Sequence, residues 1–303
     1  MVPRSARRNA GIKRGVTVMA QAQATLSIDL GGTKMLAALV RDRTVLDTHK
    51  MATPRGGNPA EWLQALFDTI APWKGRYDKV GAAVTGIVDD GHWSALNRNT
   101  LDVPERFPLT DTIARLSGSP AFAANDAQAA AWGEFSFGAG RREDMVFLTV
   151  STGIGGGIVV GGRLLGGLAG HFGQFRLDEA SRHMLEDQVS GHWIASEASP
   201  HQEGATAREV FAAANAGQDW ARRIVETSAR RTALLCRNVQ LALDPKRIVI
   251  GGSIGLAPGY LTSIERALSD LPPRLKPSIH AAELGENAGV VGIADLAERQ
   301  QQL

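Results

Sequence analysis

The chain has 303 residues and a formal net charge of +2, with 44% hydrophobic and 21% charged residues. This length suits one large domain or two of ordinary size, and the composition is that of a globular protein. The single cysteine, Cys236, excludes an internal disulfide and a multi-cysteine metal site, and no apolar run approaches the roughly 18 residues that span a bilayer. We therefore expect a cytoplasmic protein that does not bind membranes.

The positive charge is concentrated in residues 1–20, which carry five basic residues and no acidic one. The rest of the chain has a net charge of −3, and a mildly acidic body does not suit a nucleic-acid-binding surface. Residues 1–24 have no sustained apolar face, so we predict a disordered basic extension. An organelle transit peptide and a nucleic-acid-binding arm are the alternatives.

From residue 25 onwards, short apolar strands alternate with helices. The runs 26–29 and 36–40 flank a glycine turn at hairpin spacing, and 45–51 suits a third strand. Apolar residues at helical spacing predict a helix over 59–73 with Asn58 as its N-cap. The other elements predicted in this half are a strand over 79–85, a helix over 109–116, a strand over 121–124 and a helix over 127–135.

The second half repeats this theme, because strands over 145–150 and 157–160 flank a second glycine turn. The elements predicted after it are helices over 207–214 and 219–243, a strand over 247–250, and helices over 259–268 and 288–301. Alternation of strands and helices favours an α/β architecture. The repeated strand–glycine–strand unit predicts two similar halves with an intervening cleft.

The first glycine turn reads Asp29-Leu30-Gly31-Gly32-Thr33-Lys34. Glycines permit positive φ and leave backbone N–H groups free to meet phosphate oxygens, and Thr33 adds a hydroxyl donor. Asp29 can hold Mg²⁺, directly or through water, because this ion prefers oxygen ligands. The alternative is an ordinary hairpin turn without a ligand.

The second turn reads Ser151-Thr152-Gly153-Ile154-Gly155-Gly156-Gly157, which places almost no side chain between backbone and ligand. A third glycine pair, Gly251-Gly252, follows a strand, where α/β sheets typically present ligand sites, and it suits an adenosine. A surface loop and a simple strand-to-helix turn are the respective alternatives.

Asn125-Asp126 lies between the two turns. Phosphoryl transfer requires an oriented hydroxyl that loses its proton, and a carboxylate at a strand end can accept that proton. Asp126 is therefore the predicted general base of a kinase for a small hydroxylated molecule. The alternative role for either residue is a helix N-cap.

With these motifs, and with Asn125–Trp132, Leu168–His171, Thr85-Gly86 and Ala95–Asn97, the chain from about residue 25 to 300 resembles the ROK family of sugar kinases and repressors. That family lies within the actin-like ATPase superfamily. The resemblance implies an actin-like ATPase (ribonuclease H-like) α/β fold of two α/β domains with an intervening cleft. It places residues 25–121 with 290–303 in the smaller domain and 122–289 in the larger one.

The resemblance also implies ATP, Mg²⁺ and phosphorylation of a sugar 6-hydroxyl in a homodimer. The implied sugar-binding residues are Gly86, Asn97, Asn125, Asp126, His171 and Glu186. The implied ATP-binding residues are Asp29, Gly31, Gly32, Thr33, Lys34, Thr152, Gly153, Gly155, Gly251 and Gly252. Because ROK glucokinases usually carry Glu at the position of His171, the resemblance favours the branch that acts on N-acetylmannosamine. A glucokinase or fructokinase remains an alternative, as does a sugar-responsive repressor, although residues 1–24 are too short for a helix-turn-helix domain.

One departure from the family concerns its structural zinc site, built from a histidine and a cysteine-rich knuckle. Gln174 stands at the histidine position, and residues 175–186 contain no cysteine. Zinc requires Cys or His ligands in a tetrahedral array, so we predict no structural zinc. We expect an apolar cluster of Phe172, Phe175, Leu177 and Met184 to hold this loop instead. The alternative is a loop that is mobile until sugar binds.

Overall fold

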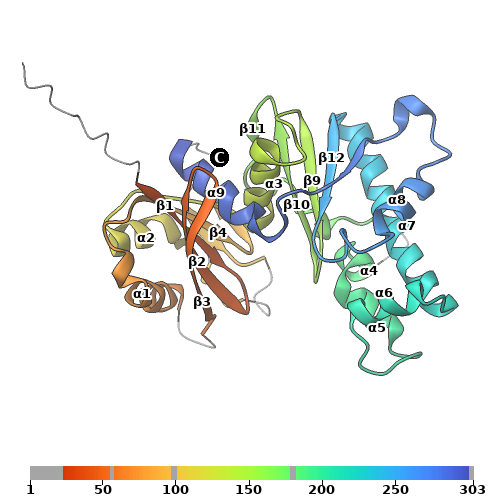
Figure 1. Cartoon of the computed structure of the whole chain (residues 1–303), viewed down its shortest axis with the longest axis horizontal. Helices are drawn as coiled ribbons and strands as arrows, with labels where there is room; N and C mark the ends of the chain where they lie inside the picture. Colours follow the sequence, from red (N-terminus) through yellow and green to blue (C-terminus); the bar gives the residue numbers. More distant parts are fainter. Residues whose placement is uncertain (1–22, 55–57, 97–100, 178–181, 300–303) are drawn as a thin grey trace, which may run out of the picture.

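The computed structural model describes residues 23–54, 58–96, 101–177 and 182–299, arranged in two lobes (Figure 1). The predicted basic extension therefore lies almost wholly outside the described residues. Among the described residues, no helix is both long and apolar enough to cross a membrane.

The first lobe comes from the N-terminal part of the chain. Its elements are β1 (Ala24–Leu30), β2 (Lys34–Arg41), β3 (Thr44–Ala52), α1 (Pro59–Thr69), η1 (Ala71–Trp73), β4 (Tyr77–Val84), β5 (Ile87–Asp89), β6 (His92–Ser94), β7 (Phe107–Pro108), α2 (Leu109–Ser117) and β8 (Ala121–Asn125). Strands β5, β6 and β7 form a small separate sheet.

The rest of the chain forms the second lobe and returns to the first one through its last helix. The elements are α3 (Asp126–Phe137), β9 (Met145–Val150), β10 (Ile154–Val160), β11 (Arg163–Leu164), η2 (Phe172–Gln174), α4 (Glu186–Val189), α5 (Gly191–Ala198), α6 (Ala207–Asn215), α7 (Asp219–Leu243), β12 (Arg247–Gly251), α8 (Tyr260–Ala267), η3 (Pro273–Leu275), β13 (Ile279–Ala281), η4 (Gly285–Asn287) and α9 (Ala288–Arg299).

The two large sheets share one topology. Their strand orders are β3-β2-β1-β4-β8 and β11-β10-β9-β12-β13. Each sheet contains an antiparallel hairpin, β1–β2 in the first and β9–β10 in the second. The first strand of each hairpin also pairs with a parallel strand, β1 with β4 and β9 with β12. The predicted similarity of the two halves is therefore confirmed.

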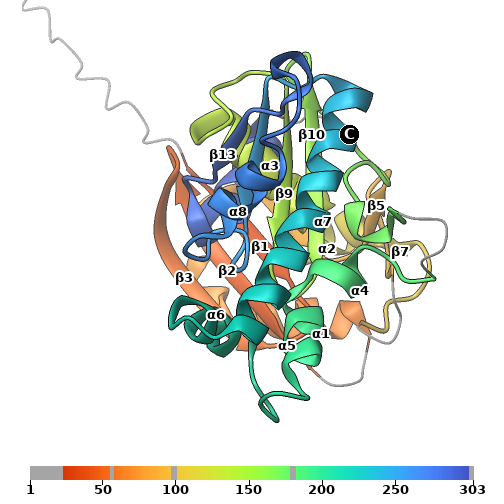
Figure 2. The same cartoon turned by 90° about the vertical axis from the view of Figure 1, so that its right-hand side faces the viewer.

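Helices α3 and α9 lie between the two sheets (Figure 1). Helix α9 packs on β1 and β4, α3 packs on β9 and β10, and the two helices pack on each other. The outer face of the first sheet is covered by α1 and α2. Helices α4 to α8 cover the outer face of the second sheet, and Figure 2 shows α7 and α8 in front of it.

The α3–α9 contact is close because glycines line it. A Cβ atom on Gly292 would lie 1.9 Å from the carbonyl oxygen of Ala129, and one on Gly133 would lie 2.3 Å from that of Ala288. On the sheet side, a Cβ on Gly81 would lie 2.5 Å from the carbonyl oxygen of Ile293. Backbone therefore meets backbone where α9 crosses the molecule.

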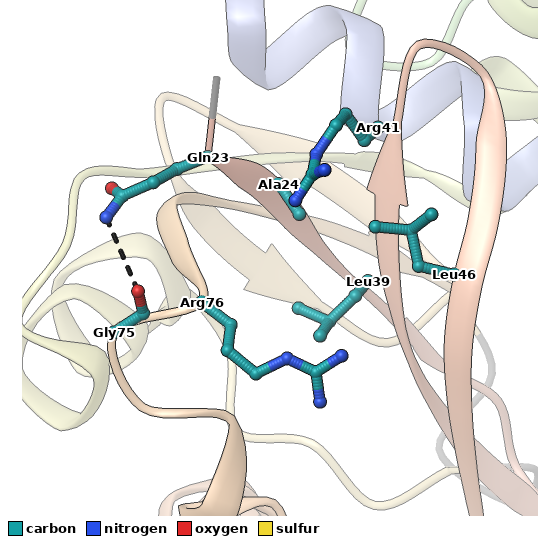
Figure 3. A pocket seen from close by; sticks show the side chains of 7 residues that line it. All are labelled: Gln23, Ala24, Leu39, Arg41, Leu46, Gly75 and Arg76. Atoms are coloured by element: carbon teal, nitrogen blue, oxygen red, sulfur yellow. Dashed lines mark hydrogen bonds between the residues drawn. The ribbon is translucent and has the colours of Figure 1, made fainter. Parts of the chain in front are cut away.

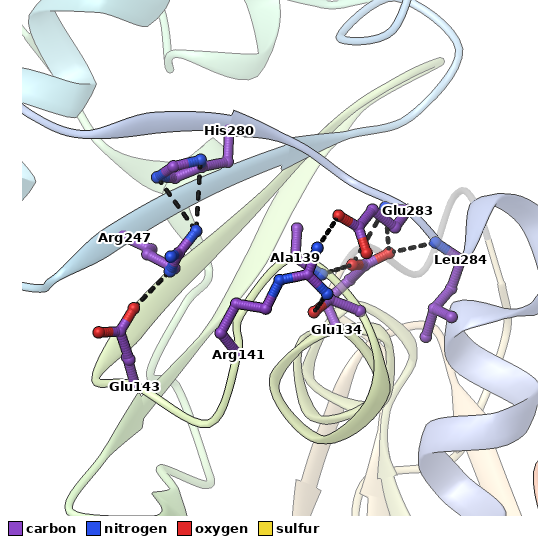
Figure 4. Close-up of polar contacts among 9 residues, drawn as sticks. Glu134, Ala139, Arg141, Glu143, Arg247, His280, Glu283 and Leu284 are labelled. Atoms are coloured by element: carbon purple, nitrogen blue, oxygen red, sulfur yellow. Dashed lines mark hydrogen bonds and ion pairs between the residues drawn. The ribbon is translucent and has the colours of Figure 1, made fainter.

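A buried carboxylate secures the chain that leads into α9 (Figure 4). Glu134, on α3, is fully buried and accepts hydrogen bonds from the backbone N–H groups of Glu283 and Leu284 (2.7–3.1 Å) and of Ala139 (2.9 Å). Beside it, Arg141 forms an ion pair with the Glu283 side chain. The segment between β13 and α9 is thereby tied to the helix layer.

Most predicted elements are confirmed with small changes at their ends. Helix α1 has the predicted cap, because the Asn58 side chain accepts from the N–H groups of Ala60 (3.0 Å) and Glu61 (3.2 Å). The predicted helix over 59–73 is wrong at its end: α1 ends at Thr69, and a 3-10 turn with Pro72 follows. Proline lacks the N–H group that would continue the helix, and it disfavours helical backbone in the residue before it.

The division into domains stays a prediction, and strand β8 bears on its boundary. Residues 121–125 pair with β4 in the first sheet, so a boundary at 121/122 would cut this strand. Division by sheets would fall after Asn125 instead. The short sheet β5–β6–β7 and helices α4 and α5 were not predicted, because their segments are too short for a clear periodic pattern.

Candidate functional site

The junction of β8 and α3 holds Asn125 and Asp126. Asn125 is the N-cap of α3, and its side-chain oxygen accepts from the N–H groups of Ala127 (2.9 Å) and Gln128 (3.2 Å). Its amide group donates to the carbonyl oxygen of Gly86 (2.9 Å). The N-cap alternative is thus confirmed for Asn125, and its side chain, predicted to contact a sugar, is hydrogen-bonded to the backbone on both ends.

Both carboxylate oxygens of Asp126 are held by hydrogen bonds. Oδ1 accepts from the N–H group of Ala127 (2.8 Å), and Oδ2 accepts from the hydroxyl of Thr85 (3.0 Å). Burial raises the pKa of Asp126, whereas these two hydrogen bonds and the nearby His171 act to lower it. The carboxylate therefore has a defined orientation and a proton affinity above that of an ordinary aspartate.

Asp29 lies near Asp126, although 97 positions separate them in the chain. Strands β1, β4 and β8 are parallel neighbours, with Asp29 beside Ala83 and Val84 beside Asn125, so the carboxyl ends of these strands meet at one edge. Burial raises the pKa of Asp29 to about 6, Asp126 contributes to this rise, and Lys34 opposes it. Two carboxylates in one partly buried site create a place that favours a cation.

The first glycine turn presents free donors beside Asp29. Gly31 donates its N–H group to the carbonyl oxygen of Lys34 (3.0 Å), and Thr53 donates its hydroxyl to that of Gly31 (2.7 Å). Gly32 and Thr33 are exposed residues, and their backbone N–H groups donate to no described residue. Such outward N–H groups suit an anionic ligand such as a phosphate.

Gly86 and His171 meet at the same edge. Gly86 has φ +117°, and a Cβ atom there would lie 2.5 Å from the carbonyl oxygen of Ser94, so only glycine fits. The Nε2 atom of His171 lies 3.3 Å from the Gly86 carbonyl oxygen, and its Nδ1 lies 3.1 Å from that of Leu168. A neutral imidazole carries one N–H and can donate to only one of these carbonyls.

The second glycine turn is held by the start of α5. Gly191 donates its N–H group to the carbonyl oxygen of Ser151 (2.7 Å), and Ser151 donates to that of Gly153 (2.8 Å). The N–H groups of Thr152 and Gly153 donate to no described residue, so this turn also presents free donors. Gly155, further along β10, faces α3: a Cβ there would lie 3.2 Å from that of Ala127.

The third glycine pair adjoins this second turn. Gly252 has φ +85°, and a Cβ atom there would lie 2.3 Å from the carbonyl oxygen of Val150. Gly251 and Gly252 therefore lie against the end of β9, from which the second turn departs. The structure thus brings together two of the three segments predicted to bind ATP.

Glu186 lies beneath the second turn. Its Oε2 atom accepts from the N–H group of Ile154 (3.2 Å), and a Cβ on Gly153 would lie 2.5 Å from the same oxygen. The same oxygen would also lie 3.4 Å from a Cβ on Gly173, in the turn η2 that follows His171. Glu186 therefore lies between the second glycine turn and the His171 loop, with no hydrogen bond to Asp126 or His171 among the described contacts. Asn97, the remaining predicted sugar ligand, lies outside the described residues.

Thr85 and Trp93 also belong to this site, although neither is among the residues predicted for it. Thr85 bonds Asp126, and the indole N–H of the fully buried Trp93 donates to the Thr85 carbonyl oxygen (2.9 Å). The position of Thr85, at the carboxyl end of a strand and directly before Gly86, was the available signal.

The loop that departs from the family pattern is held by a partly different set of apolar residues. Phe172 is buried and contacts Phe175 edge-on at 5.4 Å between ring centres, but Phe175 is 45% exposed. Leu177 packs at the edge of the core, and the fully buried residue is Leu185, which the prediction omitted. Within the described ranges, no group of three or more His, Cys, Asp or Glu side chains could hold a metal ion.

A separate pocket of about 210 Å³ opens at the other end of the β1–β2 hairpin. It is lined by Arg41, Arg76 and five other residues (Figure 3), none of which is a predicted site residue. Arg76 forms an ion pair with Asp47 (3.2 Å). This pocket is therefore distinct from the edge that holds Asp29 and Asp126.

Comparison with known proteins matches residues 25–300 to the family model described as ROK family. The chain is 47% identical over 276 residues to a bifunctional enzyme NanE/NanK of Brucella melitensis, covering 90% of this chain but 53% of that relative. It thus spans about half the length of that bifunctional relative. It is 39% identical over 288 residues to an N-acetylmannosamine kinase of Escherichia coli, covering 91% of this chain and 99% of that one.

A solved structure gives the same assignment. The ROK family glucokinase of Streptomyces griseus, in complex with glucose and AMPPNP, superposes with a TM-score of 0.74 at 30% identity, covering 91% of this chain and 99% of that one. The predicted actin-like α/β fold agrees with this neighbour. The protein belongs to the ROK family.

Proposed function

We propose that this protein is an ATP-dependent kinase that phosphorylates the 6-hydroxyl of N-acetylmannosamine. The observation that carries the proposal is the Asp126 carboxylate, held at both oxygens on the edge where Asp29, His171 and the first glycine turn meet. The choice of sugar is supported by the relatives, which include an N-acetylmannosamine kinase matched over 99% of its length.

In the proposed reaction, the sugar 6-oxygen attacks the γ-phosphorus of ATP as the bond to the β–γ bridging oxygen breaks. ADP leaves, and the hydroxyl proton passes to Asp126. The raised pKa of Asp126 suits this role, because a base with greater proton affinity accepts the proton more readily provided that it is ionised at the working pH. The free N–H groups of both glycine turns are our candidates for the phosphate contacts.

Mg²⁺ fits the donor set at the first turn. Asp29 offers carboxylate oxygens as ligands. Burial and the negative charge of Asp126 raise the pKa of Asp29 to about 6, and a cation bound there would compensate for the repulsion between the two carboxylates. When bound, the ion would neutralise charge on the ATP phosphates. We propose that activity needs Mg²⁺ but no zinc. Stoichiometric zinc that survives dialysis, and whose removal unfolds the protein, would contradict the second part.

For the sugar site we propose His171, Glu186, Gly86 and Asn97 around Asp126. Asn125 contributes indirectly, since its amide fixes Gly86 and its oxygen caps α3. The homodimer and the cytoplasmic location stay predictions, and light scattering of the purified protein tests the first of them.

A coupled ADP-release assay over a panel of sugars tests the function. We expect the highest kcat/KM with N-acetylmannosamine, compared with N-acetylglucosamine, glucose, mannose and fructose. Asp126→Asn should lower kcat by about 10²–10⁴ while sugar binding by calorimetry persists. Asp111→Asn, an exposed aspartate in the first turn of α2, is the matched control and should change neither value.

Two results would move the assignment. A kcat/KM for glucose equal to or above that for N-acetylmannosamine would make the protein another ROK hexose kinase. Near wild-type kcat in the Asp126→Asn enzyme would refute the role of Asp126.

A further inference from the structure

Thr85 is fixed on three sides at the carboxyl end of β4. Its N–H group donates to the carbonyl oxygen of Leu30 (3.3 Å), which follows Asp29. Its own carbonyl oxygen accepts from the Trp93 indole (2.9 Å), and its hydroxyl donates to Asp126 Oδ2 (3.0 Å). The residue therefore joins the first glycine turn, the small sheet and the predicted base.

The backbone around Thr85 leaves little freedom for this hydroxyl to move. Trp93 is fully buried, and the next residue, Gly86, is held by Asn125 through a hydrogen bond of 2.9 Å. The backbone of Thr85 is thus set by contacts to Leu30 and Trp93 that do not involve Asp126. It can act as a fixed support for the carboxylate.

The hydrogen bonds of the Asp126 carboxylate leave one acceptor site on Oδ2 open. A threonine hydroxyl has one proton, and here it goes to Oδ2; each carboxylate oxygen has two acceptor sites, so Oδ2 keeps one site open. Oδ1 is held by the N–H group of Ala127 (2.8 Å). Within the described part of the chain, no other side chain is hydrogen-bonded to this carboxylate.

We propose that Thr85 is a positioning residue, whose hydroxyl fixes the rotation of the Asp126 carboxylate so that the open site on Oδ2 faces the sugar hydroxyl. This inference rests on the proposed kinase function. Asp126 and Asp29 interact through their charges, as do Lys34 with Asp29 and His171 with Asp126. Thr85 instead orients the Asp126 carboxylate through a hydrogen bond. Without the hydroxyl, the carboxylate keeps hydrogen bonds only to the backbone N–H groups of Ala127 and of Asp126 itself among the described residues, and no side chain limits its rotation.

Thr85→Val tests this, since valine keeps the shape of threonine and loses only the hydroxyl. We expect kcat to fall by about 10–100-fold with the KM for the sugar changed less than about twofold, because misplacement of a reacting group by about 1 Å costs rate at this scale. Thr85→Ser keeps the donor and should restore most of kcat. Thr112→Val, at a buried threonine of α2, is the matched control for hydroxyl removal and should leave kcat unchanged.

A double variant shows whether Thr85 acts through Asp126. If it does, Thr85→Val combined with Asp126→Asn should be no slower than Asp126→Asn alone, because coupled residues are not additive. Full additivity, an unchanged kcat in Thr85→Val, or equal loss in Thr85→Ser and Thr85→Val with lowered melting temperatures would each overturn the proposal. A wild-type protein that phosphorylates no sugar of the panel would instead refute the proposed function, and this inference with it.

Discussion

Glu134 provides a strong test of how the two lobes are joined. Its buried carboxylate accepts from three backbone N–H groups, two of which belong to the segment that connects β13 to α9 (Figure 4). Glutamine at this position has nearly the same shape but only one acceptor oxygen. The amide nitrogen of the glutamine would face backbone N–H groups that now donate to the carboxylate, and two donors cannot form a hydrogen bond with each other.

The loss of stability in Glu134→Gln follows from these hydrogen bonds. At least one buried or partly buried backbone N–H group loses its acceptor, and a charge-assisted hydrogen bond is lost; each of these effects is worth about 1–3 kcal/mol. We therefore expect the free energy of unfolding to fall by about 3 kcal/mol. For a chain of this size, the melting temperature should drop by about 5–10 °C.

Thermal unfolding followed by circular dichroism measures this shift. Glu226→Gln is the control, because Glu226 is an exposed glutamate of α7, and its change should lie within about 0.5 kcal/mol of wild type. A Glu134→Gln protein that melts within about 2 °C of wild type would show that the carboxylate is not needed to hold this segment.

Three further predictions follow from the site and the helix layer. Gly292→Ala should lower the melting temperature by several degrees, since its Cβ would lie 1.9 Å from the Ala129 carbonyl oxygen. Gly289→Ala is the control, because its Cβ would lie 3.8 Å from the Asp126 carbonyl oxygen, an ordinary contact distance; equal effects of the two substitutions would contradict the close contact. Asp29→Asn should raise the melting temperature at pH 7.5 more than at pH 4.5. The pKa of Asp29 is raised from 3.8 to about 6, so the folded state binds its proton more tightly than the unfolded state, and the stability of the wild type falls as the pH rises through this range. Asparagine cannot ionise and avoids this loss. A gain of equal size at both pH values would refute this reading. His171→Glu should lower kcat/KM for N-acetylmannosamine relative to glucose by about tenfold, measured on the sugar panel, and an unchanged ratio would remove His171 from sugar selection.

Features governed by neighbours in the chain were predictable from sequence. The Asn58 cap of α1, the 25-residue helix α7 and both strand–glycine–strand hairpins appear where their local patterns place them. A cap bonds N–H groups two and three residues ahead, and a hairpin pairs strands across a few residues. The glycines of both turns and the acid at the start of α3 were found for the same reason.

The arrangement of the site was decided by tertiary structure. Asp29 and Asp126 meet only because β1, β4 and β8 are parallel neighbours, and Glu186 reaches Ile154 across 32 residues. Thr85-Gly86 was part of the family resemblance, but the role of Thr85 depends on a carboxylate 41 positions away. Such contacts depend on the order of the strands in the sheets and on helices that pack through glycine. Both arise from residues distant in sequence acting together, so no local pattern encodes them.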